Sequence, residues 1–222
     1  MHRPVKLALF DLDHTLIPFD SGMAWTRFLV ERGVLPSDAE GAYLAQCQRY
    51  VAGTLDIRAL HRASVLPLAR FSPAALASWT DEFEARMASQ ISPAARALVQ
   101  AHQDDGDLCA IVTATTRFIA EPFARLFGIT HVLATEPATE HGVFTGEIEG
   151  EPCYREHKVG HVDAWLARLG LARAGFEATW FYSDSINDLA LLSAVSNPVA
   201  VRPDERLRGH AQQAGWPIRS LD

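Results

Sequence analysis

The stretch that decides the fold is Lys6-Leu7-Ala8-Leu9-Phe10-Asp11-Leu12-Asp13-His14-Thr15. Its apolar first half predicts a buried strand of a parallel sheet, and the carboxyl ends of such strands border the crevice where open α/β sheets bind ligands. Alternation along the strand puts Asp11 and Asp13 on one side, where two carboxylates repel each other unless a cation or a shared proton relieves them. Mg²⁺ suits such a pair because it prefers hard oxygen ligands. A single Asp would indicate little, since acidic residues also end strands as turn formers or helix caps.

Further strands are predicted later in the chain, and helical patterns lie between them. The clearest helical pattern begins near Lys158, has one apolar face and ends at Gly170. Strands that alternate with helices are typical of a doubly wound parallel sheet, so the predicted fold class is α/β. The predicted strands are Lys6–Phe10, Leu108–Val112, His131–Ala134, Thr179–Ser183, Val199–Val201 and Pro217–Ser220.

Between Leu16 and Ile91 the pattern is helical throughout. Ser37-Asp38-Ala39-Glu40 has the spacing of a capping box, and Ser72-Pro73 places a proline at the first position of a helix. Ser92-Pro93 opens the helix that returns the chain to the sheet. Roughly seventy residues are too many for a single crossover helix, so we expect a helical cap, or lid, inserted after the first strand.

This pattern predicts two domains. Residues 18–91 form the cap, and residues 1–17 with 92–222 form the catalytic core. Within the core, residues 141–150 alternate apolar and polar side chains between glycines, which predicts a β-ribbon beside the sheet with a structural role.

Composition and charge limit the class of protein. The chain has 222 residues, 48% of them hydrophobic, and a net charge of −7 with scattered basic residues, which argues against a nucleic-acid partner. No apolar run is long enough for a membrane span, and a strand that begins near Met1 and ends in acid argues against a secretory signal. Three widely spaced cysteines suit reduced thiols, so we expect a cytoplasmic protein without a membrane partner. The oligomeric state is not indicated.

Polar side chains also follow other predicted strands. Thr113 ends the second core strand, Lys158 opens the amphipathic helix, and Asp184, Asn187 and Asp188 follow the strand Thr179–Ser183. Each cluster alone could be a helix cap, a solvated lysine or a turn. Together at one sheet edge, the acidic pairs require a cation, while the hydroxyl and the ammonium group require an anion. A phosphate group that bridges to Mg²⁺ satisfies both requirements.

The four motifs Asp11-x-Asp13-x-Thr15, Thr113, Lys158 and Asp184-x-x-Asn187-Asp188 resemble those of the haloacid dehalogenase-like hydrolase superfamily, in the same order. The resemblance covers essentially the whole chain and implies a Rossmann-like core. The helical insert directly after the first motif is similar to the phosphoserine-phosphatase-like branch. The stretches Thr113–Phe118 and Tyr182–Ser185 depart from the Gly-rich loops of phosphoserine phosphatase itself.

The resemblance also implies a role for each motif residue. Asp11 is the nucleophile that forms an aspartyl-phosphate, Asp13 is the general acid and base, and Thr113 with Lys158 stabilises the phosphoryl oxygens. The implied Mg²⁺ ligands are Asp11, the main-chain carbonyl of Asp13, and Asp184. Asp188 acts through water or by orienting Lys158, Thr15 fixes the loop, and Asn187 lies near the phosphate or the substrate.

Substrate choice is expected in the cap. Asp20 follows Asp11 at the spacing where phosphoserine phosphatases carry an acidic residue for the substrate amine, and Arg62 resembles their arginine for the carboxylate. Asp20 is equally well placed as a helix N-cap, and Arg62 as a solvated helix charge.

The predicted function is Mg²⁺-dependent hydrolysis of a small-metabolite phosphomonoester, with phosphoserine, histidinol phosphate or a glycerol phosphate derivative as candidates. One alternative is a phosphotransferase or mutase, which passes the phosphoryl group to an alcohol. A second alternative is a noncatalytic receiver-type signalling module, which would lack the cap.

Overall fold

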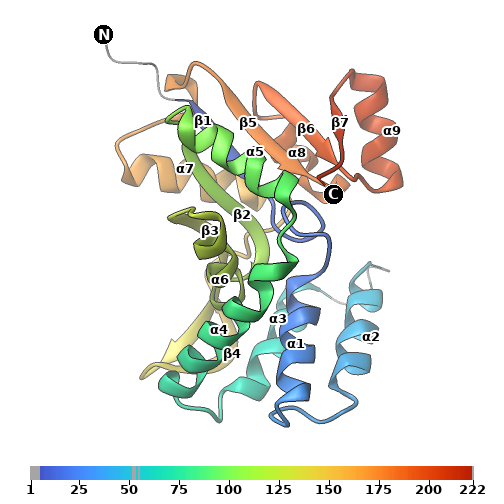
Figure 1. The fold of residues 1–222 in the computed structure, drawn as a ribbon, viewed down its shortest axis with the longest axis vertical. Coiled ribbons are helices and arrows are strands. Elements are labelled where there is room, and N and C mark those ends of the chain that lie inside the picture. The colour runs from blue at the N-terminus through green and yellow to red at the C-terminus, as the bar shows by residue number, and fades with distance from the viewer. Residues whose placement is uncertain (1–5, 52–53, 55, 222) are drawn as a thin grey trace.

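An open, seven-stranded sheet is the centre of the computed structural model, which describes residues 6–51, 54 and 56–221 (Figure 1). Residues 1–5 and 222 of the predicted core, and residues 52, 53 and 55 of the predicted cap, lie outside the described residues. The strands are β1 Leu7–Phe10, β2 Leu108–Thr116, β3 His131–Glu140, β4 Val143–Glu149, β5 Thr179–Ser183, β6 Asn197–Val201 and β7 Ile218–Arg219.

The strand order is β4-β3-β2-β1-β5-β6-β7. Neighbouring strands are parallel except β3 and β4, which are antiparallel. The chain therefore builds the sheet outward from β1 in both directions, and the carboxyl end of β1 lies between β2 and β5. This position is a topological switch point, where open α/β sheets bind ligands. The predicted doubly wound α/β fold is confirmed.

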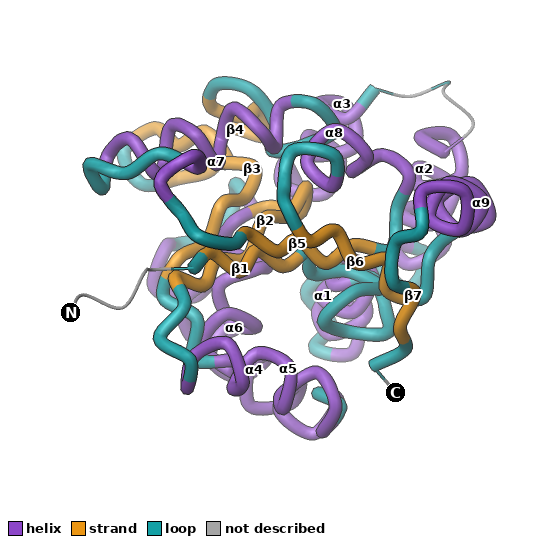
Figure 2. The backbone as a smooth tube through the Cα atoms, turned by 90° about the horizontal axis from the view of Figure 1, so that it is seen from above, coloured by secondary structure: helices purple, strands orange, loops and turns teal. Residues whose placement is uncertain are grey.

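Helices cover both faces of the sheet (Figure 2). The α-helices are α1 Ser21–Glu31, α2 Ala39–Val51, α3 Ile57–Val65, α4 Pro73–Met87, α5 Pro93–Asp104, α6 Arg117–Phe127, α7 His157–Arg168, α8 Leu189–Leu192 and α9 Glu205–Ala214. The 3-10 helices are η1 Leu66–Leu68, η2 Ala88–Gln90, η3 Arg173–Gly175 and η4 Ile186–Asp188.

Side-chain alternation in β1 explains this two-sided core. Leu7 and Leu9 belong to the cluster that contains residues of α7, α8 and α9, whereas Ala8 and Phe10 belong to the cluster formed with α5 and α6. All four side chains are buried, as expected for a central parallel strand with helices on both faces.

The segment between β1 and β2 is helical, as the sequence predicts. Ser72 and Ser92 are N-caps, and their hydroxyls accept hydrogen bonds from the amides of Ala75 and Ala95 at 3.2 and 3.0 Å. Phe83 of α4 contacts Phe123 of α6 with ring centroids 5.7 Å apart. The inserted helices therefore share a continuous apolar core with α6, and the division into two domains stays a prediction.

Strands β2 and β3 run further than predicted. β3 extends beyond the parallel sheet. The chain then turns at His141 and Gly142, both with positive φ, and β4 pairs with this extension in antiparallel direction. The predicted ribbon thus packs against the insert: a β-carbon on Gly146 would lie 2.8 Å from Cδ1 of Leu66. None of the helices in the described ranges is long and apolar enough to span a membrane.

Candidate active site

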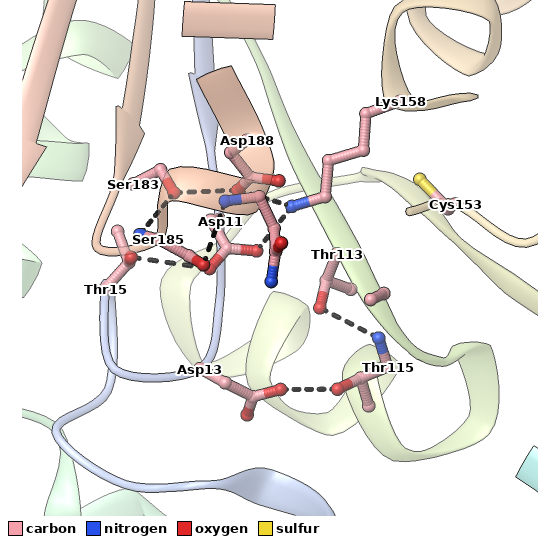
Figure 3. Close-up of polar contacts among 12 residues, drawn as sticks. Asp11, Asp13, Thr15, Thr113, Thr115, Cys153, Lys158, Ser183, Ser185 and Asp188 are labelled. Atoms are coloured by element: carbon pink, nitrogen blue, oxygen red, sulfur yellow. Dashed lines mark hydrogen bonds and ion pairs between the residues drawn. The ribbon is translucent and has the colours of Figure 1, made fainter. Parts of the chain in front are cut away.

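Asp11 lies directly after β1, where its amide donates a 2.9 Å hydrogen bond to the carbonyl of Tyr182 on β5. This bond continues the parallel ladder by one residue and fixes the carboxylate at the switch point. Its side chain is buried, and Lys158 Nζ of α7 donates to Oδ1 at 2.9 Å (Figure 3). Strand β1 and helix α7 therefore bring together two predicted catalytic residues.

Lys158 also contacts the acidic motif after β5. Its Nζ lies 2.7 Å from Oδ2 of Asp188, and the same oxygen accepts a 2.7 Å hydrogen bond from the Ser183 hydroxyl. The three side chains are buried. Asp188 is therefore positioned to orient Lys158, which is one of the two roles that the resemblance implies for it.

Thr15 connects the first and the last motif. Its hydroxyl lies 3.4 Å from Oδ2 of Asp11 and 3.2 Å from Oδ1 of Asp184. One hydroxyl proton can be donated to only one acceptor at a time. The Thr15 hydroxyl therefore offsets only part of the repulsion between the carboxylates of Asp11 and Asp184. The four sequence motifs thus meet at one edge of the sheet.

The site holds more negative than positive charge. Burial raises the pKa of Asp11 despite the lowering effect of Lys158, while Asp188 and Asp184 raise it further. Burial also raises the pKa of Asp184 to about 6. Burial favours neutral Lys158, but Asp11 and Asp188 outweigh this effect and raise its pKa, so the ammonium group stays charged. Lys158 contacts the carboxylates of Asp11 and Asp188, and among the described residues it forms no ion pair with Asp184.

This donor set fits Mg²⁺. No three His, Cys, Asp or Glu side chains within residues 6–51, 54 and 56–221 form a complete metal cage. Mg²⁺ needs no such cage, because it commonly takes one or two carboxylates and fills its other positions with water and phosphate oxygens. Asp11 and Asp184 offer those carboxylates, which Thr15 joins. The pKa values of both groups are raised, and a bound cation would lower them by stabilising the ionised carboxylates.

Asp13 is held apart from this ion pair. Its Oδ1 accepts a 2.7 Å hydrogen bond from the amide of Ser21, and its Oδ2 accepts one from the hydroxyl of Thr115. Burial and the nearby charge of Asp20 raise the pKa of Asp13 to about 6, while the bonds from Ser21 and Thr115 oppose the rise. A carboxyl group with a raised pKa can exchange protons near neutral pH. The Asp13 carboxylate is thus held between the start of α1 and strand β2.

Thr113 and Asn187 come from two different elements, β2 and η4. The buried Thr113 hydroxyl, on β2, accepts a 3.1 Å hydrogen bond from the amide of Thr115, which leaves its own proton available to a ligand. Asn187, in η4, is half-buried, and its Oδ1 accepts a 3.3 Å bond from Nε of Arg155.

The two cap predictions differ in outcome. Asp20 caps α1: its Oδ1 accepts hydrogen bonds from the amide of Met23 at 2.7 Å and the hydroxyl of Tyr43 at 2.9 Å. It also lines a cavity of about 550 Å³ together with Asp13. Arg62 does not line this cavity; its exposed guanidinium pairs with Glu147 of β4 at 2.7 Å. The structure therefore brings Asp20 to the site and leaves Arg62 outside it.

The structure also brings to the site and the cavity residues to which the sequence alone assigned no role. Ser21 and Thr115 hold Asp13, Tyr43 holds Asp20, and His61 lines the cavity wall. A signal existed only for Thr115, which lies two residues after Thr113 on the same strand face. The other contacts depend on how the inserted helices pack.

Comparisons with known proteins show the family of the chain. A family model described as haloacid dehalogenase-like hydrolase matches residues 8–193. The histidinol-phosphatase of Neisseria meningitidis serogroup C is 42% identical over 216 residues, which are 96% of this chain and 97% of that protein. The phosphoserine phosphatase SerB1 of Mycobacterium tuberculosis (strain H37Rv) is 33% identical over 219 residues, which are 96% of this chain and 70% of that protein.

A solved structure shows the same fold over the full length. The crystal structure of a protein with unknown function from Bordetella pertussis Tohama I superposes with a TM-score of 0.94 at 42% identity, and the match covers 99% of this chain and 100% of that one. The resemblance of the four motifs is thereby confirmed at the level of the family. The chain belongs to the haloacid dehalogenase-like hydrolases.

Proposed function

We propose that the protein is a Mg²⁺-dependent phosphatase that hydrolyses a small-metabolite phosphomonoester through an aspartyl-phosphate on Asp11. One observation carries the proposal: the Asp11 carboxylate is buried 2.9 Å from the Lys158 ammonium group. Asp184 is linked to the same carboxylate through Thr15, and Thr113 lies at the same site (Figure 3). A carboxylate positioned beside a cation suits attack on a phosphoryl group, whose oxygens need the positive charge.

In the first half-reaction, a carboxylate oxygen of Asp11 forms a bond to phosphorus as the bond between phosphorus and the leaving oxygen breaks. Asp13 gives its proton to that oxygen, so the alcohol leaves neutral. Thr113 and Lys158 donate hydrogen bonds to the phosphoryl oxygens, where the negative charge of the transition state is spread. The raised pKa of Asp13, about 6, supports its role as the acid.

In the second half-reaction, water attacks phosphorus and the bond to Asp11 breaks. Asp13, now ionised, takes the proton from the water, so orthophosphate leaves and both carboxyl groups return to their starting states. Asp11, Asp184 and the main-chain carbonyl of Asp13 would hold Mg²⁺, with Asp188 keeping Lys158 in place. When bound, the metal neutralises charge on the phosphoryl oxygens.

The substrate is proposed to be a small phosphorylated alcohol whose carbon skeleton occupies the cavity beside Asp13. The names of the relatives suggest two candidates, histidinol phosphate and phosphoserine. Both carry an amino group, for which Asp20 is the proposed partner, and Asn187 is proposed to face the phosphate. The cytoplasmic location and the absence of nucleic-acid and membrane partners stay predictions.

The test is orthophosphate release from p-nitrophenyl phosphate and from both candidate esters, with and without Mg²⁺. We expect Mg²⁺-dependent release, lost in Asp11→Asn and kept in Asp163→Asn, whose carboxylate pairs with Arg173 on the exposed face of α7. An added alcohol that received the phosphoryl group in place of water would show a phosphotransferase. Full activity of Asp11→Asn would rule out the proposed nucleophile.

A further inference from the structure

The cavity beside Asp13 has a one-sided distribution of charge. Its lining contains the carboxylates of Asp13 and Asp20 and, among the described residues, no lysine or arginine. Residues 52, 53 and 55, which belong to the undescribed part of the connection between α2 and α3, are alanine, glycine and leucine and bring no charge. The other titratable side chains on the cavity wall are His14, Tyr43, Cys47 and His61. None of these four carries a permanent positive charge.

The arginines of the neighbouring helix α3 are engaged elsewhere. Arg62 pairs with Glu147 at 2.7 Å, and Arg58 donates a 2.9 Å hydrogen bond to the carbonyl of Gly150 and pairs with Glu151 at 3.4 Å. Both guanidinium groups lie on the exposed outer side, toward the β3–β4 ribbon and the loop after it. A carboxylate inside the cavity would therefore meet no arginine from α3.

One carboxylate oxygen of Asp20 remains available to accept a hydrogen bond from a ligand. Both hydrogen bonds to Asp20 go to Oδ1, and no described residue donates to Oδ2. Burial and the charge of Asp20 raise the pKa of Tyr43, so its hydroxyl stays protonated and fixes the Asp20 carboxylate. An ammonium group in the cavity thus finds a carboxylate that is already oriented.

Two uncharged polar groups complete the wall. Nε1 of Trp25 and Nε2 of His61 are buried without a hydrogen-bond partner among the described residues, and both side chains line the cavity. Burial lowers the pKa of His61 to about 4, so this ring is neutral at pH 7. A volume of about 550 Å³ also exceeds what a two-carbon leaving group needs. Neutral polar atoms further along the leaving group could form hydrogen bonds with these two nitrogens.

We propose that this cavity selects phosphate monoesters of amino alcohols that carry an ammonium group and no carboxylate. The inference rests on the phosphatase activity proposed above. A carboxylate in the leaving group would lose its water beside Asp13 and Asp20 with no cation to receive it. An ammonium group in the same place is stabilised by the carboxylate of Asp20, which Met23 and Tyr43 already hold in place.

A matched pair of substrates tests the inference on the wild-type enzyme. O-phosphoserinamide differs from O-phosphoserine only in having a neutral carboxamide in place of the carboxylate. We expect kcat/KM for the amide to exceed that for phosphoserine at least about tenfold, because the carboxylate of phosphoserine places a negative charge beside Asp13 and Asp20. N-acetylation of the amide removes the positive charge of the ammonium group, so kcat/KM should fall at least about tenfold. p-Nitrophenyl phosphate reports the basal chemistry in the same assay.

Replacing the Asp20 carboxylate by a neutral amide tests whether its charge causes the preference for the amide substrate. Asn caps helices as well as Asp does, so Asp20→Asn removes the charge while the start of α1 is kept. We expect the preference for the amide over phosphoserine to shrink at least about fivefold in this variant. The matched control is Asp56→Asn, the N-cap of α3, whose exposed carboxylate does not line the cavity and whose substitution leaves the preference unchanged.

Equal or better turnover of phosphoserine by the wild-type enzyme would overturn the inference while the phosphatase activity stands. Turnover of p-nitrophenyl phosphate with neither serine derivative accepted would overturn it as well. Release of phosphate from none of the esters would instead remove the proposed function, and the inference with it.

Discussion

Lys158 and Asp11 are 147 positions apart in the sequence, yet Nζ of one lies 2.9 Å from Oδ1 of the other in a buried site. Nζ also lies 2.7 Å from Asp188, so one ammonium group holds two carboxylates that would otherwise repel each other. Removing this cation should affect both stability and chemistry.

Lys158→Met keeps the length of the side chain and removes its charge. Because the change leaves two buried carboxylates without their partner, we expect a loss of about 3–5 kcal/mol in the free energy of unfolding. Activity should fall by about 10²–10³-fold, as for the loss of one oxyanion donor. Urea unfolding and the rate of phosphate release measure the two effects. Adding Asp188→Asn should restore part of the stability and none of the activity; a double variant no more stable than Lys158→Met would argue against the charge explanation.

Asp13→Asn should separate substrates by their leaving groups. An alkyl ester needs a proton on its leaving oxygen, so its turnover should fall by about 10²–10⁴-fold. p-Nitrophenolate leaves without a proton, so phosphorylation of Asp11 by p-nitrophenyl phosphate should be much less affected. A burst of p-nitrophenol followed by slow turnover is the expected time course. An equal loss for both esters would contradict the acid role.

Thr115→Val tests how Asp13 is held. Valine keeps the shape of threonine but cannot donate the hydrogen bond to Oδ2 of Asp13. Since a hydrogen bond to a charged group contributes about 1.5–3 kcal/mol, hydrolysis of an alkyl ester should fall about tenfold to a hundredfold, with a smaller loss for the aryl ester. Thr115→Ser should restore the rate. A variant that lost both activities equally, with no rescue by serine, would indicate a packing role.

The buried His61 predicts an acid dependence of stability. Its pKa falls from an ordinary value of 6.5 to about 4 in the folded protein, so the unfolded chain takes up a proton first as the pH drops. The folded state should lose about 3 kcal/mol from this group between pH 6.5 and 4. Urea unfolding of wild type and His61→Gln across this range measures the difference.

Other groups act in the opposite direction in the same range. Asp13 and Asp184, with raised pKa values of about 6, stabilise the folded state as they protonate. They are present in both proteins, so their contribution cancels in the comparison with His61→Gln. Parallel pH curves for the two proteins would show that His61 titrates normally.

The sequence predicted which motifs meet at the switch point, because their positions depend on local patterns; their catalytic roles stay predictions. A short apolar run ending in Asp11, and another ending near Thr113, mark strand ends, and parallel strands bring such ends to one edge of the sheet. Lys158 lies in the first turn of an amphipathic helix, which its apolar periodicity predicts. These positions are fixed by periodicity and chain order.

The cap side of the site could not be predicted in the same way. The bond from Tyr43 to Asp20 and the pairing of Arg62 with Glu147 depend on how helices pack on each other and on the β3–β4 ribbon. Local sequence does not encode which face of an exposed helix meets a distant strand. The extension of β3 was missed because it continues beyond the apolar run into a polar hairpin.

The central claim is that Asp11 carries the phosphoryl group, and an acyl phosphate can be trapped chemically. Borohydride reduces an aspartyl-phosphate to homoserine, which peptide mass spectrometry locates. With Asp13→Asn, p-nitrophenyl phosphate and Mg²⁺, we predict homoserine at position 11 and at no other aspartate, and none without the ester. Phosphate release with Asp11 unmodified in the trapped protein, or homoserine at Asp184 or Asp188, would contradict the claim.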